Sequence, residues 1–153
     1  MNNNLSFKII SDLDTFLQQQ ERENQIIVFT NGCFDLLHDG HLYLLKEAKK
    51  FGGILIVAVN DDDSVKRLKG ITRPIESLEL RMQKLAELET VDFVISFSED
   101  TPLQLIEKIK PAVLVKGGDY KKEEIVGNNI ALQTVIIPLL EGFSTTKIIQ
   151  SKQ

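Results

Sequence analysis

The sequence has little of what marks secreted, membrane-spanning or disulfide-bonded proteins. Its single cysteine, Cys33, excludes an intramolecular disulfide and is typical of a reducing compartment. Residues 1–4 are polar and offer no apolar core for a secretory signal. The longest apolar runs, such as residues 54–59, are far too short to cross a membrane. We therefore expect a soluble, cytoplasmic protein.

Charge and size narrow the class of ligand. The formal net charge is −4 at pH 7, so no general positive surface for nucleic acid or an anionic membrane is expected. A phosphate-bearing ligand must therefore be held by local cations and backbone N–H groups. The 153 residues are enough for one domain with a real core, and 42% apolar residues are ordinary for a globular protein.

Five short apolar runs, rich in valine and isoleucine, alternate with amphipathic segments. The runs do not alternate apolar with polar residues, which indicates strands buried on both faces. This alternation predicts an α/β fold, a Rossmann-like doubly wound parallel five-stranded sheet with flanking helices. The expected strands are 26–30, 54–60, 93–97, 113–116 and 134–138, and the expected helices are 11–22, 40–50, 62–69, 77–89, 102–109 and 145–149.

Polar clusters follow four of the expected strands. They comprise residues 31–41, 60–63, 116–120 and 141–146. Ligands of such sheets bind beyond the carboxyl ends of the strands, which lie at one edge. These clusters are therefore expected to converge on one site.

The segment 31–41 is the most informative part of the chain. It contains both histidines, His38 and His41, in a His-x-Gly-His motif between a strand and a helix. A strand, a glycine-bearing turn and a helix aim backbone N–H groups and a positive dipole end at a phosphate. Together with Gly32 and Gly40, the imidazoles indicate phosphate contact rather than solvated helix residues. No zinc pattern and no P-loop motif is present, so neither a metal site nor a P-loop ATPase is expected.

Several other polar residues have two interpretations each. Asp35 could cap its turn or orient a histidine, and Cys33 is expected to pack rather than to act as a nucleophile. The cations Lys66, Arg67, Lys69 and Arg73 form either a solvated face or a polyphosphate site, for which Lys69 and Arg73 are the best candidates.

The remaining candidates follow later in the chain. Arg81 could extend to solvent or pair with Glu76 or Glu79. Lys116 and Asp119 could hold a phosphate and a hydroxyl beside glycines that permit close backbone approach. Ser144 and Thr145 are either an ordinary helix cap or a phosphate seat. Residues 120–129 are either a mobile lid or a solvated connection.

The sequence resembles the cytidylyltransferase-like nucleotidyltransferases, whose hallmark is a His-x-Gly-His motif on this fold. Within them it is most similar to the adenylyltransferase part of bacterial ADP-heptose synthases. The resemblance is carried by residues 31–41, 57–62, 66–70 with 73–74, 115–120 and 142–149, in the order of the family.

The resemblance implies a reaction. D-glycero-D-manno-heptose 1-phosphate would react with ATP to give ADP-heptose, for lipopolysaccharide core synthesis, and pyrophosphate. ATP is then a substrate, Mg²⁺ accompanies its phosphates, and the enzyme is expected to form a homodimer. The resemblance assigns catalysis to His38, His41 and Lys69, nucleotide binding to Gly32, Phe34, Asp35, Gly40, Ser144 and Thr145, and substrate binding to Asn60, Arg73, Arg81, Lys116, Gly118 and Asp119.

The sequence also departs from its relatives. Many of them carry a sugar-kinase domain, for which residues 1–25 leave no room, so we expect one domain, 1–153, with a helical extension over 1–25 and a separate upstream kinase. Residues 128–133 lack an expected glycine pair. The alternatives are a glycerol-3-phosphate cytidylyltransferase, which shares the motif, and a nucleotide-binding module without turnover.

Overall fold

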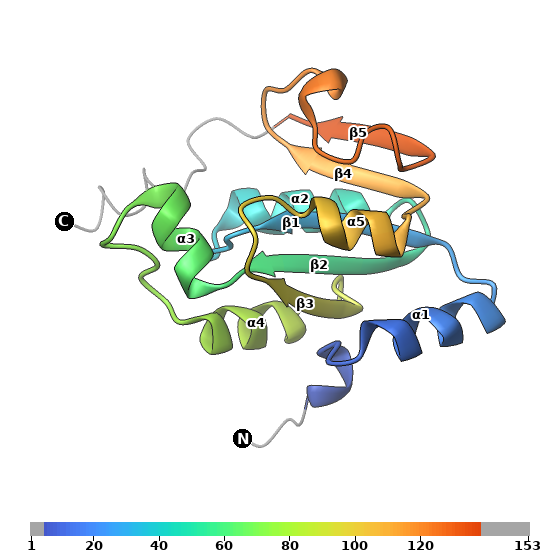
Figure 1. Cartoon of the computed structure of the whole chain (residues 1–153), viewed down its shortest axis with the longest axis horizontal. Helices are drawn as coiled ribbons and strands as arrows, with labels where there is room; N and C mark the ends of the chain where they lie inside the picture. The colour runs from blue at the N-terminus through green and yellow to red at the C-terminus, as the bar shows by residue number, and fades with distance from the viewer. Residues whose placement is uncertain (1–4, 139–153) are drawn as a thin grey trace.

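The computed structural model describes residues 5–138 of the chain (Figure 1). Its elements are η1 (Ser6–Lys8), α1 (Leu13–Arg22), β1 (Ile27–Gly32), α2 (Asp39–Lys49), β2 (Ile54–Asn60), α3 (Asp62–Lys69), α4 (Leu78–Ala86), β3 (Phe93–Phe97), α5 (Leu103–Ile109), β4 (Val113–Gly117), η2 (Lys122–Glu124) and β5 (Gln133–Ile137). The expected helix 145–149 and the polar cluster 141–146 lie outside the described residues. Within residues 5–138, no helix is long and apolar enough to cross a membrane.

The five strands form one parallel sheet in the order β3-β2-β1-β4-β5, which confirms the predicted architecture. The chain moves outward from β1 to β3, returns to β4 on the other side of β1, and ends at β5. The boundary between β1 and β4 is therefore the topological switch point, where doubly wound sheets bind their ligands.

The pairing of β1 changes along its length. It pairs with β2 from Ile27↔Ile54 to Gly32↔Val59, but with β4 only at Val28↔Val113 and Phe29↔Leu114. Beyond Phe29 the two strands separate toward their carboxyl ends. A space therefore opens beside the end of β1, at the switch point.

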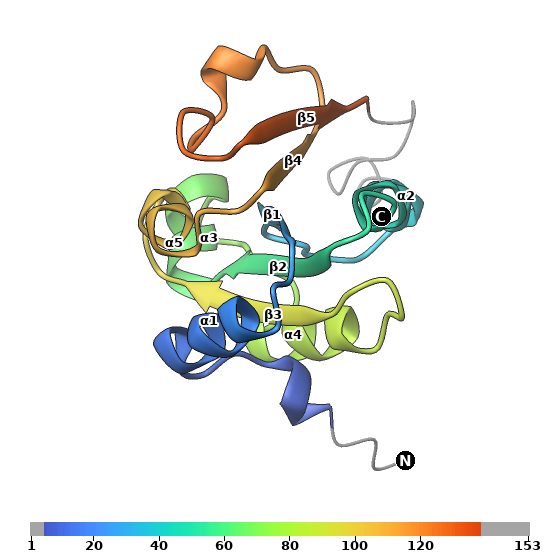
Figure 2. The same cartoon turned by 90° about the vertical axis from the view of Figure 1, so that its right-hand side faces the viewer.

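Helices cover both faces of the sheet (Figure 2). Leu55, Val57 and Val59 of β2 pack with residues of α2 and α4 on one face. Ile56 and Ala58 pack with residues of α5 and α1 on the other face. Successive residues of a strand point to opposite faces of the sheet. Because both faces are buried here, the strands appear in the sequence as unbroken apolar runs.

The helices begin where polar side chains accept hydrogen bonds from the first turn. Asp12, Asp61 and Ser77 accept from Thr15, Ser64 and Leu80 N–H groups, respectively. Such caps satisfy N–H groups that have no partner within the helix. The predicted helix 77–89 was too long at both ends, because Ser77 is its cap and α4 stops at Ala86.

The N-terminal extension is an integral part of the domain. Ile9 forms a parallel bridge with Val94 at the edge of the sheet, and the Ile10 N–H donates to the Val94 carbonyl at 2.9 Å. Lys8 Nζ lies 2.9, 3.2 and 3.0 Å from the carbonyl oxygens of Ala86, Leu88 and Val91, where α4 ends. One ammonium group thus satisfies the carbonyls of a helix end and fixes the extension against it.

We expect the Lys8→Met substitution to lower the free energy of unfolding by about 1–3 kcal/mol, because charge-assisted hydrogen bonds to partly buried carbonyls would be lost. Urea denaturation measures the change. Lys50→Met is the matched control, since Lys50 is 63% exposed and pairs only with its helix neighbour Glu47. A loss for Lys8→Met no larger than the control's would contradict the role of Lys8.

Candidate functional site

A cavity of about 560 Å³ lies at the carboxyl ends of β1, β2 and β4. It occupies the switch point where β1 and β4 separate, as the topology requires. Its lining residues are Asn31, Gly32, Cys33, Phe34, His41, Leu44, Asn60, Leu68, Lys69, Asp100, Thr101, Pro102, Lys116, Gly117, Tyr120, Glu124, Ile125 and Val126. The polar clusters after the first, second and fourth strands therefore converge as predicted.

The two histidines are locked together at the start of α2. The His38 side chain is the N-cap and accepts from the Gly40 N–H through Nδ1 at 3.0 Å. His41 Nδ1 accepts from the His38 N–H at 3.3 Å, which completes a capping box. The rings are stacked, with centroids 3.8 Å apart. Of the two, His41 lines the cavity, and Phe34 contacts it from the other side.

This geometry determines the protonation of both rings. A neutral imidazole that accepts through Nδ1 carries its proton on Nε2, so each histidine presents an Nε2–H donor. Burial, His38 and Lys69 together lower the pKa of His41 to about 3, and burial lowers that of His38. Both rings are therefore neutral donors at physiological pH. A bound phosphate would favour the charged form of both rings.

The turn between β1 and α2 is strained. Phe34 and Leu36 have φ angles of +50° and +61°, in the left-handed region that favours glycine. Each non-glycine residue there costs roughly 1–2 kcal/mol. Such outliers persist only where surrounding contacts hold them.

Two carboxylates hold this turn reciprocally against the loop before α4. Asp35 accepts from the Ile75 and Glu76 N–H groups at 2.7 and 2.9 Å and from Arg73 Nε at 2.9 Å. Glu76 in return accepts from the Leu36 N–H at 3.1 Å. Burial raises the pKa of Asp35, but these hydrogen bonds outweigh it and lower the pKa below its usual value. Asp35 is fully buried, so it joins two loops rather than capping its own turn or orienting a histidine.

Arg81 is buried and does not line the cavity. The prediction that it contacts the substrate is therefore corrected. Its side chain is 0% exposed. Nη1 donates to the carbonyl oxygens of Cys33 and Asn60, both at 2.7 Å, while Nε donates to Glu76 and Nη2 to Asp62. Because these partners occupy the guanidinium, it neither extends to solvent nor reaches the cavity.

Lys69 and Lys116 are the cations of the cavity. Lys69 ends α3, and Lys116 lies in β4 with its Nζ 5.6 Å from the centre of the Tyr120 ring. Burial lowers the pKa of Lys116, and Lys69 lowers it further. Neither lysine forms an ion pair with any residue in the described part of the chain. A bound anion would therefore meet two cations that have no ion-pair partner in the described part of the chain.

Some of the predicted site residues line the cavity and others do not. Those in its wall are Gly32, Phe34, His41, Asn60, Lys69 and Lys116. Those predicted but not in the wall are His38, Asp35, Gly40, Arg73, Arg81, Gly118 and Asp119. Arg73, predicted to neutralise phosphate, instead pairs with Asp35. Ser144 and Thr145 lie outside the described residues.

Sequence reasoning assigned no site residue to the loop after β3, although Asp100, Thr101 and Pro102 line the cavity, and it left the role of residues 120–129 open. Tyr120, Glu124, Ile125 and Val126 line the cavity too, and Ile125 is 8% exposed and packs into the core. The segment 120–129 is therefore anchored beside the site and is more than a solvated connection. The apolar pair Ile125 and Val126 was the feature of the sequence that could have indicated this anchoring. Cys33 also lines the cavity, and burial raises the pKa of its thiol, which agrees with a packing role.

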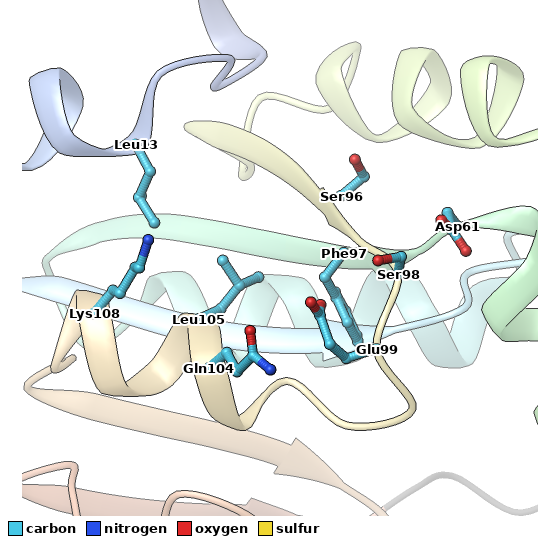
Figure 3. A pocket seen from close by; sticks show the side chains of 9 residues that line it. All are labelled: Leu13, Asp61, Ser96, Phe97, Ser98, Glu99, Gln104, Leu105 and Lys108. Atoms are coloured by element: carbon cyan, nitrogen blue, oxygen red, sulfur yellow. The ribbon is translucent and has the colours of Figure 1, made fainter.

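A second cavity, of about 350 Å³, lies between α1 and α5 (Figure 3). Its walls come from α1, β3, the loop after β3 and α5, and it contains no histidine. Asp61 borders it but is occupied as the cap of α3. The cavity has one cation in its lining, Lys108, together with the carboxylates of Asp61 and Glu99, so unlike the first cavity it does not combine a histidine with two lysines.

Comparison with known proteins agrees with the site. A family model described as cytidylyltransferase-like matches residues 29–151. The chain belongs to this family. The matched residues include the histidine motif, the α3 lysine and the β4 lysine, which are the groups that meet in the cavity.

Individual relatives are also similar. The chain is 56% identical over 146 residues to the bifunctional protein HldE of Helicobacter hepaticus, covering 95% of this chain and 30% of that protein. It is 50% identical over 143 residues to HldE of a Nitratiruptor species, covering 94% of this chain and 31% of that protein. The chain thus spans under a third of the length of these curated relatives.

Solved structures support the same fold. A lipopolysaccharide core biosynthesis protein from Thermoplasma volcanium is 31% identical with a TM-score of 0.65, covering 76% of this chain and 99% of that one. A pantoate-beta-alanine ligase from Francisella tularensis, at 19% identity and a TM-score of 0.65, covers 94% of this chain and 72% of that one, and shares the fold.

We expect His41 to titrate with a pKa of about 3 in the free protein, and ATP to raise this pKa because phosphate favours imidazolium. NMR titration of the ring protons measures both values. An unfolded histidine has a pKa of about 6.5. Between about pH 3 and pH 6.5 the unfolded chain therefore binds more protons at His41 than the folded chain does. The contribution of His41 to the free energy of unfolding therefore falls as the pH is lowered through that window. Titration of His41 near 6.5 in the free protein would contradict this assignment.

Proposed function

We propose that this domain transfers an adenylyl group from ATP to D-glycero-D-manno-heptose 1-phosphate, releasing pyrophosphate and ADP-heptose. The observation that carries the proposal is the meeting of His41, Lys69 and Lys116 in one cavity at the switch point. The segments 31–41 and 115–120, which carry the resemblance to the adenylyltransferase branch, contribute two of its walls. Identity of 50% and above to HldE proteins along most of this chain supports the same branch.

The proposed reaction is a direct displacement at phosphorus. An oxygen of the sugar 1-phosphate attacks the α-phosphorus of ATP in line, and the bond to the leaving pyrophosphate breaks with its electron pair. The attacking oxygen is already anionic and the leaving group departs as an anion, so no general base or acid is required. The protein therefore acts by positioning and by electrostatic stabilisation of the phosphorus centre.

The side chains of the cavity fit this task. His41 Nε2–H donates to an oxygen of the α-phosphate, and as a neutral donor it needs no prior change of protonation. Lys69 and Lys116 stabilise the negative charge that moves toward the pyrophosphate oxygens. His38 supports His41 through the capping box and ring stacking. Asn60, with its amide Nδ2 bonded to Ser64, lines the cavity at the end of β2.

Mg²⁺ would bind together with the nucleotide. Within residues 5–138, no group of three or more His, Cys, Asp or Glu side chains could hold a metal ion. The cavity residues thus do not provide a carboxylate cage, and the ion would be held through the phosphate oxygens of ATP. The expected homodimer and cytoplasmic location remain predictions, and light scattering of the purified protein tests the first.

We expect pyrophosphate release with ATP and heptose 1-phosphate, and little with CTP, GTP or glycerol 3-phosphate. A coupled pyrophosphate assay across the three nucleotides and two acceptors measures this. Turnover only with CTP and glycerol 3-phosphate would assign the chain to the cytidylyltransferase alternative. An absence of turnover with every pair, together with nucleotide binding, would identify a binding module.

We expect Lys69→Ala to lower kcat/KM about 10- to 100-fold, because a charge-assisted phosphate contact contributes about 1.5–3 kcal/mol. Lys66→Ala is the matched control, since Lys66 lies one turn earlier on the exposed surface of α3 and outside the cavity. Steady-state kinetics at several ATP concentrations compares the two. Equal effects of both substitutions would mean that Lys69 acts only through the general charge of the helix.

A further inference from the structure

A carboxylate from a distant loop holds the strained turn that precedes the histidines. The Leu36 N–H donates to Glu76 Oε1 at 3.1 Å, across a separation of 40 residues in the chain. Leu36 has φ +61°, which a side chain rarely adopts, and Glu76 is only 9% exposed. The other carboxylate oxygen of Glu76 pairs with Lys84. Glu76 does not line the cavity, and the proposed reaction has no use for it as a ligand.

Leu36 is connected to His41 through the backbone. Two residues after Leu36, the His38 N–H donates to His41 Nδ1 at 3.3 Å. This hydrogen bond keeps the proton of His41 on Nε2 and fixes the direction of the ring in the cavity wall. Rotation of Leu36 out of the left-handed region would move the His38 N–H and release that ring.

We propose that Glu76 is a positioning residue for nucleotidyl transfer, which holds the Leu36 N–H and thereby keeps His41 Nε2–H directed at the substrate phosphate. Asp35 fastens the same two loops from the opposite side through the Ile75 and Glu76 N–H groups. Asp35 is the residue between the two strained positions, Phe34 and Leu36, so the turn is bonded to the loop before α4 through Asp35 and through the Leu36 N–H. The kinetic part of this inference rests on the proposed function.

Glycine at position 36 provides a direct test. Glycine adopts positive φ without steric cost, so Leu36→Gly should keep the turn in place without the carboxylate. We expect Glu76→Ala to lower kcat about tenfold or more while KM for ATP changes less, because the cavity lysines are untouched. The double variant Glu76→Ala/Leu36→Gly should recover most of the lost kcat. Glu76→Gln should lie in between, since its amide oxygen can still accept from Leu36.

Lys84→Met is the matched control. It removes the ion pair on the outer oxygen of Glu76 and leaves the Leu36 hydrogen bond intact, so we expect kcat to stay unchanged. A merely structural role for Glu76 would not be rescued by glycine at position 36, because glycine does not refill the space of the lost carboxylate. The rescue therefore separates positioning from packing.

A second measurement is independent of turnover. The chain has only two histidines, so the ring nitrogen signals of His41 can be assigned by NMR with little ambiguity. We expect one tautomer, protonated on Nε2, in the wild type, a mixture in Glu76→Ala, and the single tautomer again in the double variant. Wild-type kcat and tautomer in Glu76→Ala, or failure of Leu36→Gly to restore them, would overturn the inference. If the wild type turns over no substrate, the proposed function fails, while the NMR comparison still decides the role of Glu76.

Discussion

The site depends on the burial of one guanidinium, that of Arg81. Its N–H groups bond to the carbonyl oxygens of Cys33, Asn60 and Glu76 and to the carboxylate of Asp62. A buried charge is tolerated only while its partners remain in place, so the β1–α2 turn, the end of β2 and the start of α3 are fixed relative to one another. Lysine could not replace it, because one ammonium cannot span acceptors spread over a planar fork.

Around this support, contacts within the protein alone hold the cavity wall and the turn that precedes the histidines. The separation of β1 from β4 opens the cavity, and the reciprocal contacts of Asp35 and Glu76 hold the left-handed residues of the turn. The capping box then fixes the histidine rings in one tautomer. Because the strain is offset during folding, substrate binding need not supply the free energy for aligning these donors.

The sequence was sufficient for the parallel sheet and for the convergence of His41, Asn60 and Lys116, because buried parallel strands leave unbroken apolar runs and topology places their ends together. The end of β1 was placed two residues too early, since Asn31 and Gly32 continue the strand without apolar side chains. The sequence was insufficient for Arg81, since a helical arginine flanked by leucines has the same local pattern whether it extends to solvent or is buried. Only its partners, far away in the chain, decide this. Likewise, no local signal shows that Leu36, a leucine, adopts a conformation typical of glycine.

The charged groups of the cavity favour an anionic ligand. Lys116 is buried enough for its pKa to be lowered, Lys69 lies close enough to lower it further, and His41 is kept neutral by both burial and Lys69. The two carboxylates that line the cavity have other partners, since Asp100 pairs with Arg67 and Glu124 accepts from the Lys121 N–H. In the proposed complex, the negative charge of a polyphosphate would offset that of the two lysines and would raise the pKa of His41. The charge of the cavity thus supports the proposal that both the donor and the acceptor of the transferred group carry phosphate.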